Sequence, residues 1–492
     1  MQNFGNARRQ SIILGAGELD GKTLLTTDTH LPFSVNINLK RGTEDDAPKI
    51  SFPVVQGMGF VTARYTNASP MVQTAGQGFK DVSSPVSIGK SAKYRIKDMD
   101  DRSWILYVHP GVGTLYDAKH ATRITKLDAH TIILPSGFTG TLQLARNSLG
   151  AEGEALYDRS FNTFVTAATI TASVAEARGT YSFLYSKIGS SPLLMFLLPH
   201  HLQSLDPELK PGLTKLQLRT TTKGTATAIF VTDHLTFVEP NLPTTMGFGP
   251  WTPAIANTRI RYPPDMLAFL AGVAERDLRR SMTEEKNQDS TYQAGKSLAK
   301  FATIIWVIKD VLSNTPLAST ALDKLKLKMA RYVQNRQHHP LYYDDAWKGV
   351  VSNAGFSNGP AADFANTYYN DHHAHYGYFV YAAAVIAYLD PGWLERGDNR
   401  AWTNMLVKDF AESEYAGRDY PFSRSFDWWH GHSWARGLFE APEGKEQEAM
   451  GEDGFAAFAV KMWGRVCGDG NMERRGVWSV LQVLVVGLGT QC

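Results

Sequence analysis

The sequence predicts a multidomain protein in which an antiparallel β-sandwich precedes an all-α domain. Three observations support this fold class. Short runs rich in Thr, Val, Ile, Phe and Tyr fill the first half, a Pro/Gly-rich connection follows, and helical periodicity dominates the second half. The length of 492 residues allows two to four domains. We therefore expect a β-sandwich-type domain at 1–240, a connection at 241–264 and a helical domain at 265–492.

The strand-like runs extend from about Leu24 to Val238. They are short and are separated by Gly, Pro, Asn and Asp, and so many of them favour a sandwich over a small sheet. The apolar stretch at 191–205 indicates a buried strand or core segment. We expect its His200 and His201 to have a structural or loop role rather than to bind a metal.

The helical half begins where Pro263 and Pro264 precede Asp265, a typical helix start. The first predicted helix, Asp265–Ser281, carries its apolar residues near one face. The other predicted helices are Ser290–Leu312, Thr320–Arg336, Tyr376–Leu389, Asn399–Ser413 and Lys445–Arg465. About six helices without intervening strands indicate an α/α toroid or a bundle. Six helices would make only half of a six-hairpin barrel. The tail, Gly476–Cys492, does not resemble the start of six more helices.

Composition limits the classes of partner. Fifty basic residues nearly balance 48 acidic ones, and the formal net charge is +2, so we expect neither nucleic acid nor membrane as a partner. The two cysteines, Cys467 and Cys492, exclude a disulfide framework. The N-terminus shows no evident export signal, and the apolar tail Val477–Leu488 is too short to span a bilayer. We expect a monomer that binds a neutral or small partner. The sequence does not determine the cellular compartment in which the protein acts.

The stretch 368–384 holds the first candidate site, where Asp371 and three histidines lead into an apolar helix. Imidazole and carboxylate groups bind metals, but His372, His373 and His375 are crowded and lack a fourth ligand at a known spacing. We therefore expect no metal. Asp371 is either a general acid with the His and Tyr side chains as its hydrogen-bonding shell, or simply an N-cap residue.

The stretch 420–463 holds the second candidate site, in which carboxylates and histidines lie among tryptophans. On the predicted helix, Glu448 and Glu452 would share one face, a turn apart. Such a pair is either a solvated helix face or part of a carbohydrate site, because glycoside hydrolysis uses paired carboxylates. The aromatic side chains would stack on sugar rings or belong to the core. They are Trp428, Trp429 and Trp434.

A family resemblance rests on these same residues. The segment 419–453, DYPFSRSFDWWHGHSWARGLFEAPEGKEQEAMGED, closely resembles the signature of the endo-β-1,3-glucanases of glycoside hydrolase family 81, especially the fungal ones. Similar segments follow the order of that family. They are FPVVQGMGFVTARY (52–65), STYQAGKSLAKFA (290–302) and YYNDHHAHYGYFVYAAA (368–384).

The resemblance implies a β-sandwich, a small α/β region and an (α/α)6 barrel. It also implies hydrolysis of internal β-1,3-glucosidic bonds of a laminarin-like or fungal cell-wall glucan, with inversion and without a cofactor. By matching motifs, Asp371 is the expected general acid, Glu448 the expected base, and Glu452 the second essential Glu and alternative base. The expected substrate-binding residues are His375, Tyr376, Asp427, Trp429, His432 and Trp434.

Inversion sets expectations for the geometry. The acid and base carboxyls of inverting enzymes stand roughly 6.5 to 9.5 Å apart, which leaves room for a water molecule. Burial or nearby carboxylates should raise the pKa of Asp371 so that it enters the reaction protonated, whereas Glu448 should be ionised.

The chain also departs from the family pattern. Members continue with further helices after the segment matched by 468–476, whereas this chain runs VWSVLQVLVVGLGTQC and stops. We therefore expect a chain truncated at both ends and a barrel incomplete at its C-terminus. Family members are usually secreted or associated with the cell wall. Two other hypotheses remain: a catalytically impaired β-glucan-binding or misfolded remnant, and a metal-dependent hydrolase built on the His cluster.

Overall fold

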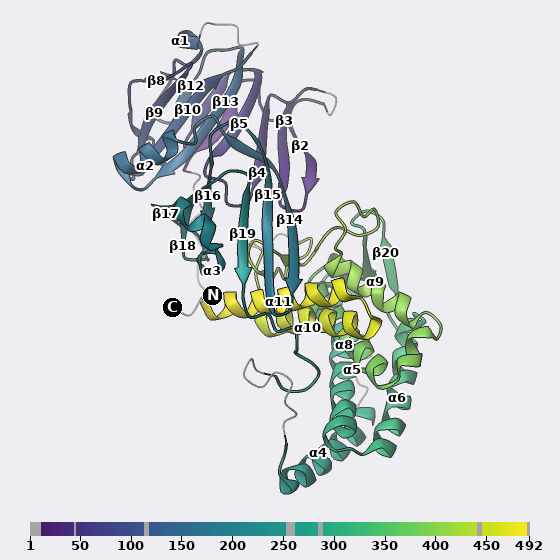
Figure 1. The fold of residues 1–492 in the computed structure, drawn as a ribbon. Coiled ribbons are helices and arrows are strands. Elements are labelled where there is room, and N and C mark those ends of the chain that lie inside the picture. Colours follow the sequence, from purple (N-terminus) through teal and green to yellow (C-terminus); the bar gives the residue numbers. More distant parts are fainter. Residues whose placement is uncertain are drawn as a thin grey trace. The chain divides into compact units, whose positions relative to one another are not determined.

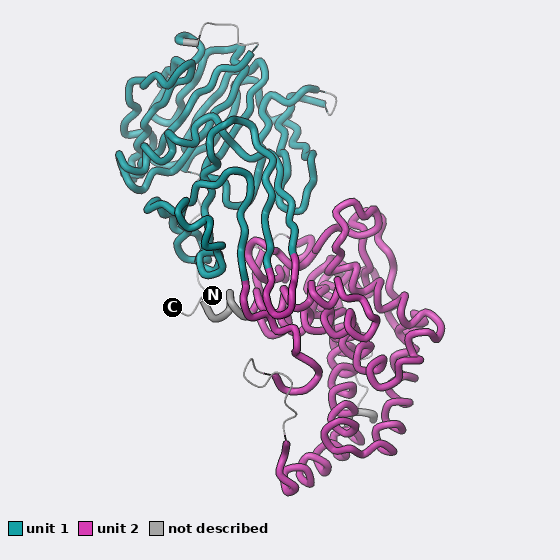
Figure 2. Tube along the Cα trace, viewed as in Figure 1, with its two compact units in different colours: residues 1–172, 180–238 teal, residues 173–179, 239–492 magenta. Residues whose placement is uncertain are grey.

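The structure is a computed structural model that describes residues 11–43, 46–112, 118–251, 261–283, 289–439 and 445–489. The chain forms two compact units, coloured separately in Figure 2: unit 1 comprises residues 1–172 and 180–238, and unit 2 comprises residues 173–179 and 239–492. The predicted order, a β-rich region followed by a helical region, is confirmed (Figure 1). Residues 252–260 of the predicted connection lie outside the described residues.

Unit 1 contains a nine-stranded antiparallel sheet with the order β2-β3-β4-β5-β13-β10-β9-β7, in which β8 also pairs with β9. Its strands are β2 (Thr23–Leu31), β3 (Ser34–Arg41), β4 (Ile50–Val55), β5 (Val61–Ala68), β7 (Phe79–Val82), β8 (Val86–Ile88), β9 (Ser91–Asp98), β10 (Ser103–Pro110) and β13 (Phe138–Asn147). A four-stranded sheet packs on one face. Its strands are β1 (Ile13–Ala16), β6 (Pro70–Gln73), β12 (Thr131–Ile133) and β11 (Thr125–Lys126). Val72 and Ile132 meet Tyr65 and Leu106 in the shared core, which makes this region a sandwich.

Shorter elements complete unit 1. One core cluster joins Tyr107 of the large sheet to Tyr157 of a helix and Leu194 of a three-stranded sheet. That sheet has the order β16-β18-β17, and another has the order β14-β15-β19. The elements are α1 (Ala118–Ala121), α2 (Gly150–Asp158), β14 (Phe164–Ala175), β15 (Arg178–Ile188), β16 (Leu193–Leu197), α3 (Pro199–Ser204), β17 (Leu213–Arg219), β18 (Thr225–Val231) and β19 (His234–Glu239).

His201 has a structural role. It is buried in α3, and its Nδ1 accepts the Leu198 N–H at 3.2 Å.

The tip of the β14–β15 hairpin, residues 173–179, belongs to unit 2. Gly179 approaches the side chains of Trp478 and Leu242, and a Cβ on this glycine would lie 2.2 Å from Trp478 Cζ2. Only a residue without a side chain fits this contact.

Unit 2 is built around a helix that is buried on every side. Of α8 (His372–Leu389), almost every residue from His372 to Ala387 is buried, and the helix contacts α5, α9 and α10. The helices are α4 (Pro264–Thr283), α5 (Thr291–Trp306, extended by a π-helical turn at Val307–Val311), α6 (Thr315–Val333), α7 (Ala354–Asn358), α9 (Asn399–Ala411), α10 (Met450–Cys467) and α11 (Gly470–Gly489). Two short hairpins accompany them: β20 (Leu341–Asp344) with β21 (Gly349–Ser352), and β22 (Phe426–Asp427) with β23 (His432–Ser433).

The six predicted helices are all present with shifted ends, and the starts of the third and the last shift most. The helix expected to start at Thr320 starts at Thr315. The helix expected to start at Lys445 starts at Met450 instead. The tail also contains a helix, α11, which the sequence did not indicate. Within the described part of the chain, no helix has both the length and the apolar character needed to cross a membrane.

A glycine sets how closely α10 and α11 approach. A Cβ on Gly476 would lie 2.4 Å from the backbone nitrogen of Lys461, so the helices must separate to admit one. Overpacking of this kind costs about 2 kcal/mol, and we expect Gly476→Ala to lower the free energy of unfolding by that amount. Urea denaturation measures it. The matched control is Gly454→Ala in α10, where the nearest neighbour is Val483 at 3.9 Å; it should gain up to about 1 kcal/mol from helix propensity. Equal effects of the two changes would contradict this account.

Candidate active site

Asp371 stands at the start of α8 in an unusual backbone conformation. Its φ is +48°, in the left-handed region that costs a residue with a side chain about 1 kcal/mol or more. The Asp371 N–H donates to the carbonyl of Ala435 at 2.9 Å, and the Asp371 carbonyl accepts the N–H groups of Ala374 and His375, both at 2.9 Å. Asp371 is the N-cap residue of α8, as the N-cap interpretation expects, but its side chain makes no capping hydrogen bond. Instead, the carboxyl accepts the Asn370 amide at 3.0 Å.

Glu448 lies outside the helix that the sequence predicted for it. It is an exposed residue in the segment 445–449, just before α10. The expectation that Glu448 and Glu452 share one helical face is therefore wrong. The reason is a tertiary hydrogen bond: the Ala435 N–H donates to the carbonyl of Glu446 at 2.7 Å and holds this segment beside the loop that also binds Asp371.

Asp371 and Glu448 interact with each other. The Glu448 carboxyl lies near enough to that of Asp371 to raise its pKa. Burial raises the pKa of Asp371 to about 7, the charges of Glu448 and Glu452 add to the rise, and the charge of His373 opposes it. The expected raised pKa of the acid is thus present. The expected separation of roughly 6.5 to 9.5 Å between the acid and the base stays a prediction.

Glu452 is fixed by a group of polar side chains. Its Oε1 accepts the hydroxyls of Tyr292 and Tyr378, each at 2.6 Å, and Lys296 Nζ lies 3.7 Å away. Lys296 also donates to the Tyr292 hydroxyl at 3.0 Å. Sequence reasoning missed these three partners as functional residues, although Tyr292 and Lys296 belong to the matching segment 290–302 and could have been found there.

The tryptophan-rich loop is organised by Asp427. Its Oδ1 accepts the N–H groups of Trp429 at 2.8 Å and of His430 at 3.1 Å. Its Oδ2 contacts His430 Nδ1 at 2.7 Å and accepts Trp434 Nε1–H at 3.0 Å. Burial alone would raise the pKa of Asp427, but the hydrogen bonds from His430 and Trp434 outweigh it and hold the pKa well below its usual range. Asp427 therefore remains charged and holds the turn at 427–431.

The other predicted substrate-binding residues differ in exposure. Trp429, His432, His375 and Tyr376 are buried, and Trp434 is partly exposed. The Tyr376 hydroxyl donates to the Val350 carbonyl at 2.7 Å inside the unit. Their assignment to glucan subsites stays a prediction.

Two consecutive histidines of α8 each meet a buried carboxylate. His372 Nδ1 lies 2.5 Å from Asp409 Oδ2, and His373 Nε2 lies 2.8 Å from Asp453 Oδ1. Among the described residues, no group of three or more His, Cys, Asp or Glu side chains is arranged to hold a metal ion. The sequence revealed neither carboxylate, because Asp409 is 37 residues from His372 and nothing in the local pattern connects them.

The structure thus brings together the three predicted carboxylates, Asp371, Glu448 and Glu452, with the hydroxyls around Glu452. Two models of known protein families match most of the chain. The model of the glycosyl hydrolase family 81 N-terminal domain matches residues 3–253, and that of the C-terminal domain matches residues 261–485. The chain belongs to glycosyl hydrolase family 81.

Relatives in this family come from several fungi. The chain is 42% identical over 471 residues to a "Glucan endo-1,3-beta-D-glucosidase" of Arthroderma benhamiae, covering 95% of this chain and 50% of the relative. It is 36% identical over 433 residues to the "Primary septum glucan endo-1,3-beta-D-glucosidase" of Schizosaccharomyces pombe, covering 87% of this chain and 41% of the relative. The chain therefore spans about half the length of these curated relatives.

A solved family 81 structure has the same fold. The structure of a glycoside hydrolase family 81 protein from Clostridium thermocellum superimposes with a TM-score of 0.71 over 98% of this chain and 64% of that chain, at 19% sequence identity. A match at this identity confirms the fold, with its β-rich region followed by a helical region.

Proposed function

We propose that this member of family 81 hydrolyses internal β-1,3-glucosidic bonds of β-1,3-glucan by an inverting mechanism. Asp371 is the general acid, and Glu448 is the general base, with Glu452 as the alternative. The observation that carries the proposal is the raised pKa of Asp371 beside two further carboxylates. The substrate class follows the names of the relatives, which are glucan endo-1,3-beta-D-glucosidases.

In this mechanism Asp371 gives its proton to the glycosidic oxygen while the bond from that oxygen to the anomeric carbon breaks. A carboxylate on the other side takes a proton from a water molecule, whose oxygen bonds to the same carbon from the opposite face. Asp371 ends ionised and the base ends protonated, so one proton must return before the next cycle.

The two candidate bases differ in what they must do first. Glu448 acts on the pKa of Asp371 in the absence of glucan, and a glucan chain that enters between the two carboxyls would separate them further. Glu448 is exposed and its segment precedes the helix, which leaves it room for this movement. Glu452 is held by Tyr292 and Tyr378 and would act from a fixed position.

The proposal is tested by incubating the purified chain with laminarin and following reducing sugar and the anomeric form of the first product by NMR. We expect internal cleavage with the α-anomer formed first, and an unchanged rate in EDTA. Laminarin binding without sugar release would instead favour a glucan-binding protein without catalysis. A β-anomer as first product would refute inversion, and loss of activity in EDTA would favour the metal-dependent alternative.

The pKa of Asp371 predicts the alkaline side of the pH profile. The acid works only while protonated, and its pKa of about 7 means that the protonated fraction falls as the pH rises through 7. We expect kcat/KM to decrease about tenfold per pH unit above that value. A profile of kcat/KM on laminarin between pH 4 and 9 measures this limb. A limb near pH 4, the ordinary range of an aspartic acid, would contradict the raised pKa.

A further inference from the structure

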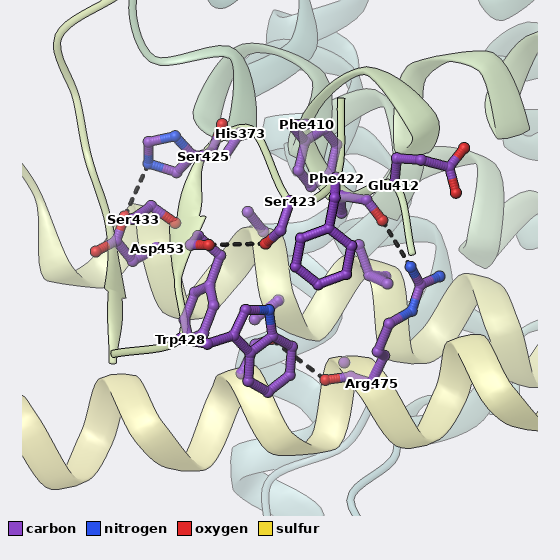
Figure 3. A pocket seen from close by; sticks show the side chains of 17 residues that line it. His373, Phe410, Glu412, Phe422, Ser423, Ser425, Trp428, Ser433, Asp453 and Arg475 are labelled. Carbon is purple, nitrogen blue, oxygen red and sulfur yellow. Dashed lines mark hydrogen bonds and ion pairs between the residues drawn. The ribbon is translucent and has the colours of Figure 1, made fainter. Parts of the chain in front are cut away.

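An aromatic side chain needs an exposed face to stack on a sugar ring. Figure 3 shows Phe410 and Trp428 in the wall of a largely apolar cavity. Phe410 is 4% exposed and Trp428 is 6% exposed, so protein already covers both rings. Phe364 differs from them. It is 53% exposed and lies in the segment Ala362–Tyr368, just before α8.

The ring of Phe364 lies next to groups that hold a candidate base. Its centroid is 4.9 Å from that of the Tyr292 ring, at an interplanar angle of 60°. Tyr292 is one of the residues that donate a hydroxyl hydrogen to Glu452. Lys296 Nζ lies 4.7 Å from the centroid of the same tyrosine ring. Phe364 and Lys296 therefore both contact Tyr292, beside the carboxylate that it holds.

The backbone that carries Phe364 is strained. The φ angles of three consecutive residues are +50° at Asp363, +53° at Phe364 and +63° at Ala365, all in the left-handed region. Residues with a Cβ enter this region singly rather than in runs, because the Cβ then comes too close to the following carbonyl oxygen. Strain of this kind is found mainly at active sites and in segments that clamp a ligand.

Side-chain hydrogen bonds hold the strained segment on two sides. The Asp363 carboxyl accepts the Ser290 hydroxyl at 2.7 Å, directly before the start of α5. The Asn370 side-chain amide donates to the Phe364 carbonyl at 3.2 Å and to the Asp371 carboxyl at 3.0 Å. The position of Phe364 is thereby tied both to α5 and to the expected acid.

Packing does not explain an exposed phenylalanine on a strained backbone. Burial of the ring would offset the strain by removing apolar surface from water, but Phe364 stays about half exposed. Phe269 offers a contrast. It is 70% exposed on the regular helix α4, and single exposed apolar residues of this kind are normal. The combination of strain and exposure at Phe364 therefore indicates a role in binding.

A β-linked glucosyl ring matches the surface that Phe364 offers. Its hydroxyls are equatorial, so each face of the sugar carries C–H groups, which the electron-rich face of an aromatic ring attracts. Lys296, whose side chain is 45% exposed, has three N–H hydrogens and gives one to the Tyr292 hydroxyl, so it can also donate to a sugar hydroxyl. An apolar surface with a few polar groups around it is typical of small-molecule sites.

We propose that Phe364 is a substrate-binding residue: its exposed ring stacks on the C–H face of a glucosyl residue bound beside Asp371 and Glu452. The strained segment, held through Asp363 and Asn370, keeps the ring in place before the glucan arrives, which lowers the entropic cost of binding. This inference rests on the proposed function for the identity of the sugar.

The test measures the binding of laminarihexaose to the full chain by calorimetry. The parent and all variants carry Asp371→Asn, which prevents cleavage and keeps an oxygen for the Asn370 amide. We expect Phe364→Ala and Phe364→Leu each to raise Kd about tenfold, because both remove the flat ring. Phe364→Leu can still pack against Tyr292, and it covers the case in which Phe364→Ala does not fold. Phe364→Tyr keeps the ring and should leave Kd within about threefold.

Phe269→Ala is the matched control, because it removes a comparably exposed ring from α4. It should leave Kd unchanged. Binding by Phe364→Leu as tight as that of the parent would overturn the inference. So would a loss of affinity in Phe364→Tyr as large as that in Phe364→Leu, or a parent that does not bind laminarihexaose.

Sugar release separates this inference from the proposed function. A chain with Asp371 intact that releases no sugar from laminarin, while Phe364→Leu still weakens binding, would refute hydrolysis and support the stacking role. Sugar release together with an unchanged Kd in Phe364→Leu would support hydrolysis and overturn the stacking role.

Discussion

Asp371→Asn is expected to abolish laminarin hydrolysis while laminarin binding stays within about threefold of wild type. The loss in kcat should be on the order of a thousandfold, because an amide cannot give a proton to the leaving oxygen and general acids contribute this much. Binding should survive because Asn has the size of Asp and the backbone contact with Ala435 does not involve the side chain. Reducing-sugar release and calorimetry with laminarin measure the two quantities separately.

A matched control excludes a general effect of charge removal. Asp310, whose carboxyl accepts the Tyr388 hydroxyl at 2.8 Å on an exposed part of unit 2, should tolerate the same change to Asn without loss of turnover. Near-normal turnover by Asp371→Asn would show that the acid is another residue.

Asp409→Ala should unfold the protein at a much lower urea concentration than wild type. Both side chains of the His372–Asp409 pair are fully buried. Asp409 Oδ2 is the partner of His372 Nδ1 at 2.5 Å. Asp409 Oδ1 also accepts the Val350 N–H at 2.7 Å. Removing the Asp409 carboxyl leaves both of these buried groups without their partner, which should cost about 4 kcal/mol.

The appropriate comparison is an ion pair on the surface. Glu395 meets Arg400 at 2.7 Å, and their side chains are 76% and 42% exposed. Glu395→Ala should therefore leave the urea midpoint unchanged within error. If the two Ala variants lost equal stability, the burial of the His372–Asp409 pair would not explain its contribution.

The order of the two regions could be predicted from the sequence because local patterns determine it. Alternation with turn residues indicated strands before Val238, and apolar periodicity indicated helices after Pro264. The family resemblance and the cluster of candidate carboxylates came from the same local segments. These features require no knowledge of distant contacts.

The geometry of the site depended on contacts that no local pattern contains. Glu448 lies outside α10 because the backbone of Ala435 holds its segment. Asp371 has a left-handed backbone, which Asp adopts more readily than most residues but which the local sequence did not indicate here. The partners of Glu452 come from α5 and α8, far apart along the chain. Sequence reasoning could therefore identify the carboxylates but could not place them.

The left-handed backbone at Asp371 has a consequence for how mutations would be tolerated. Asp363, Phe364, Ala365 and Tyr369 share a positive φ with it, so much of the segment that leads into α8 is held in conformations that side chains disfavour. Backbone strain of this kind persists only where the surrounding structure holds it, and it clusters at active sites and ligand-binding sites. Asp371→Gly would relieve the strain and also remove the carboxyl, so under the proposed mechanism stability would rise while turnover is lost.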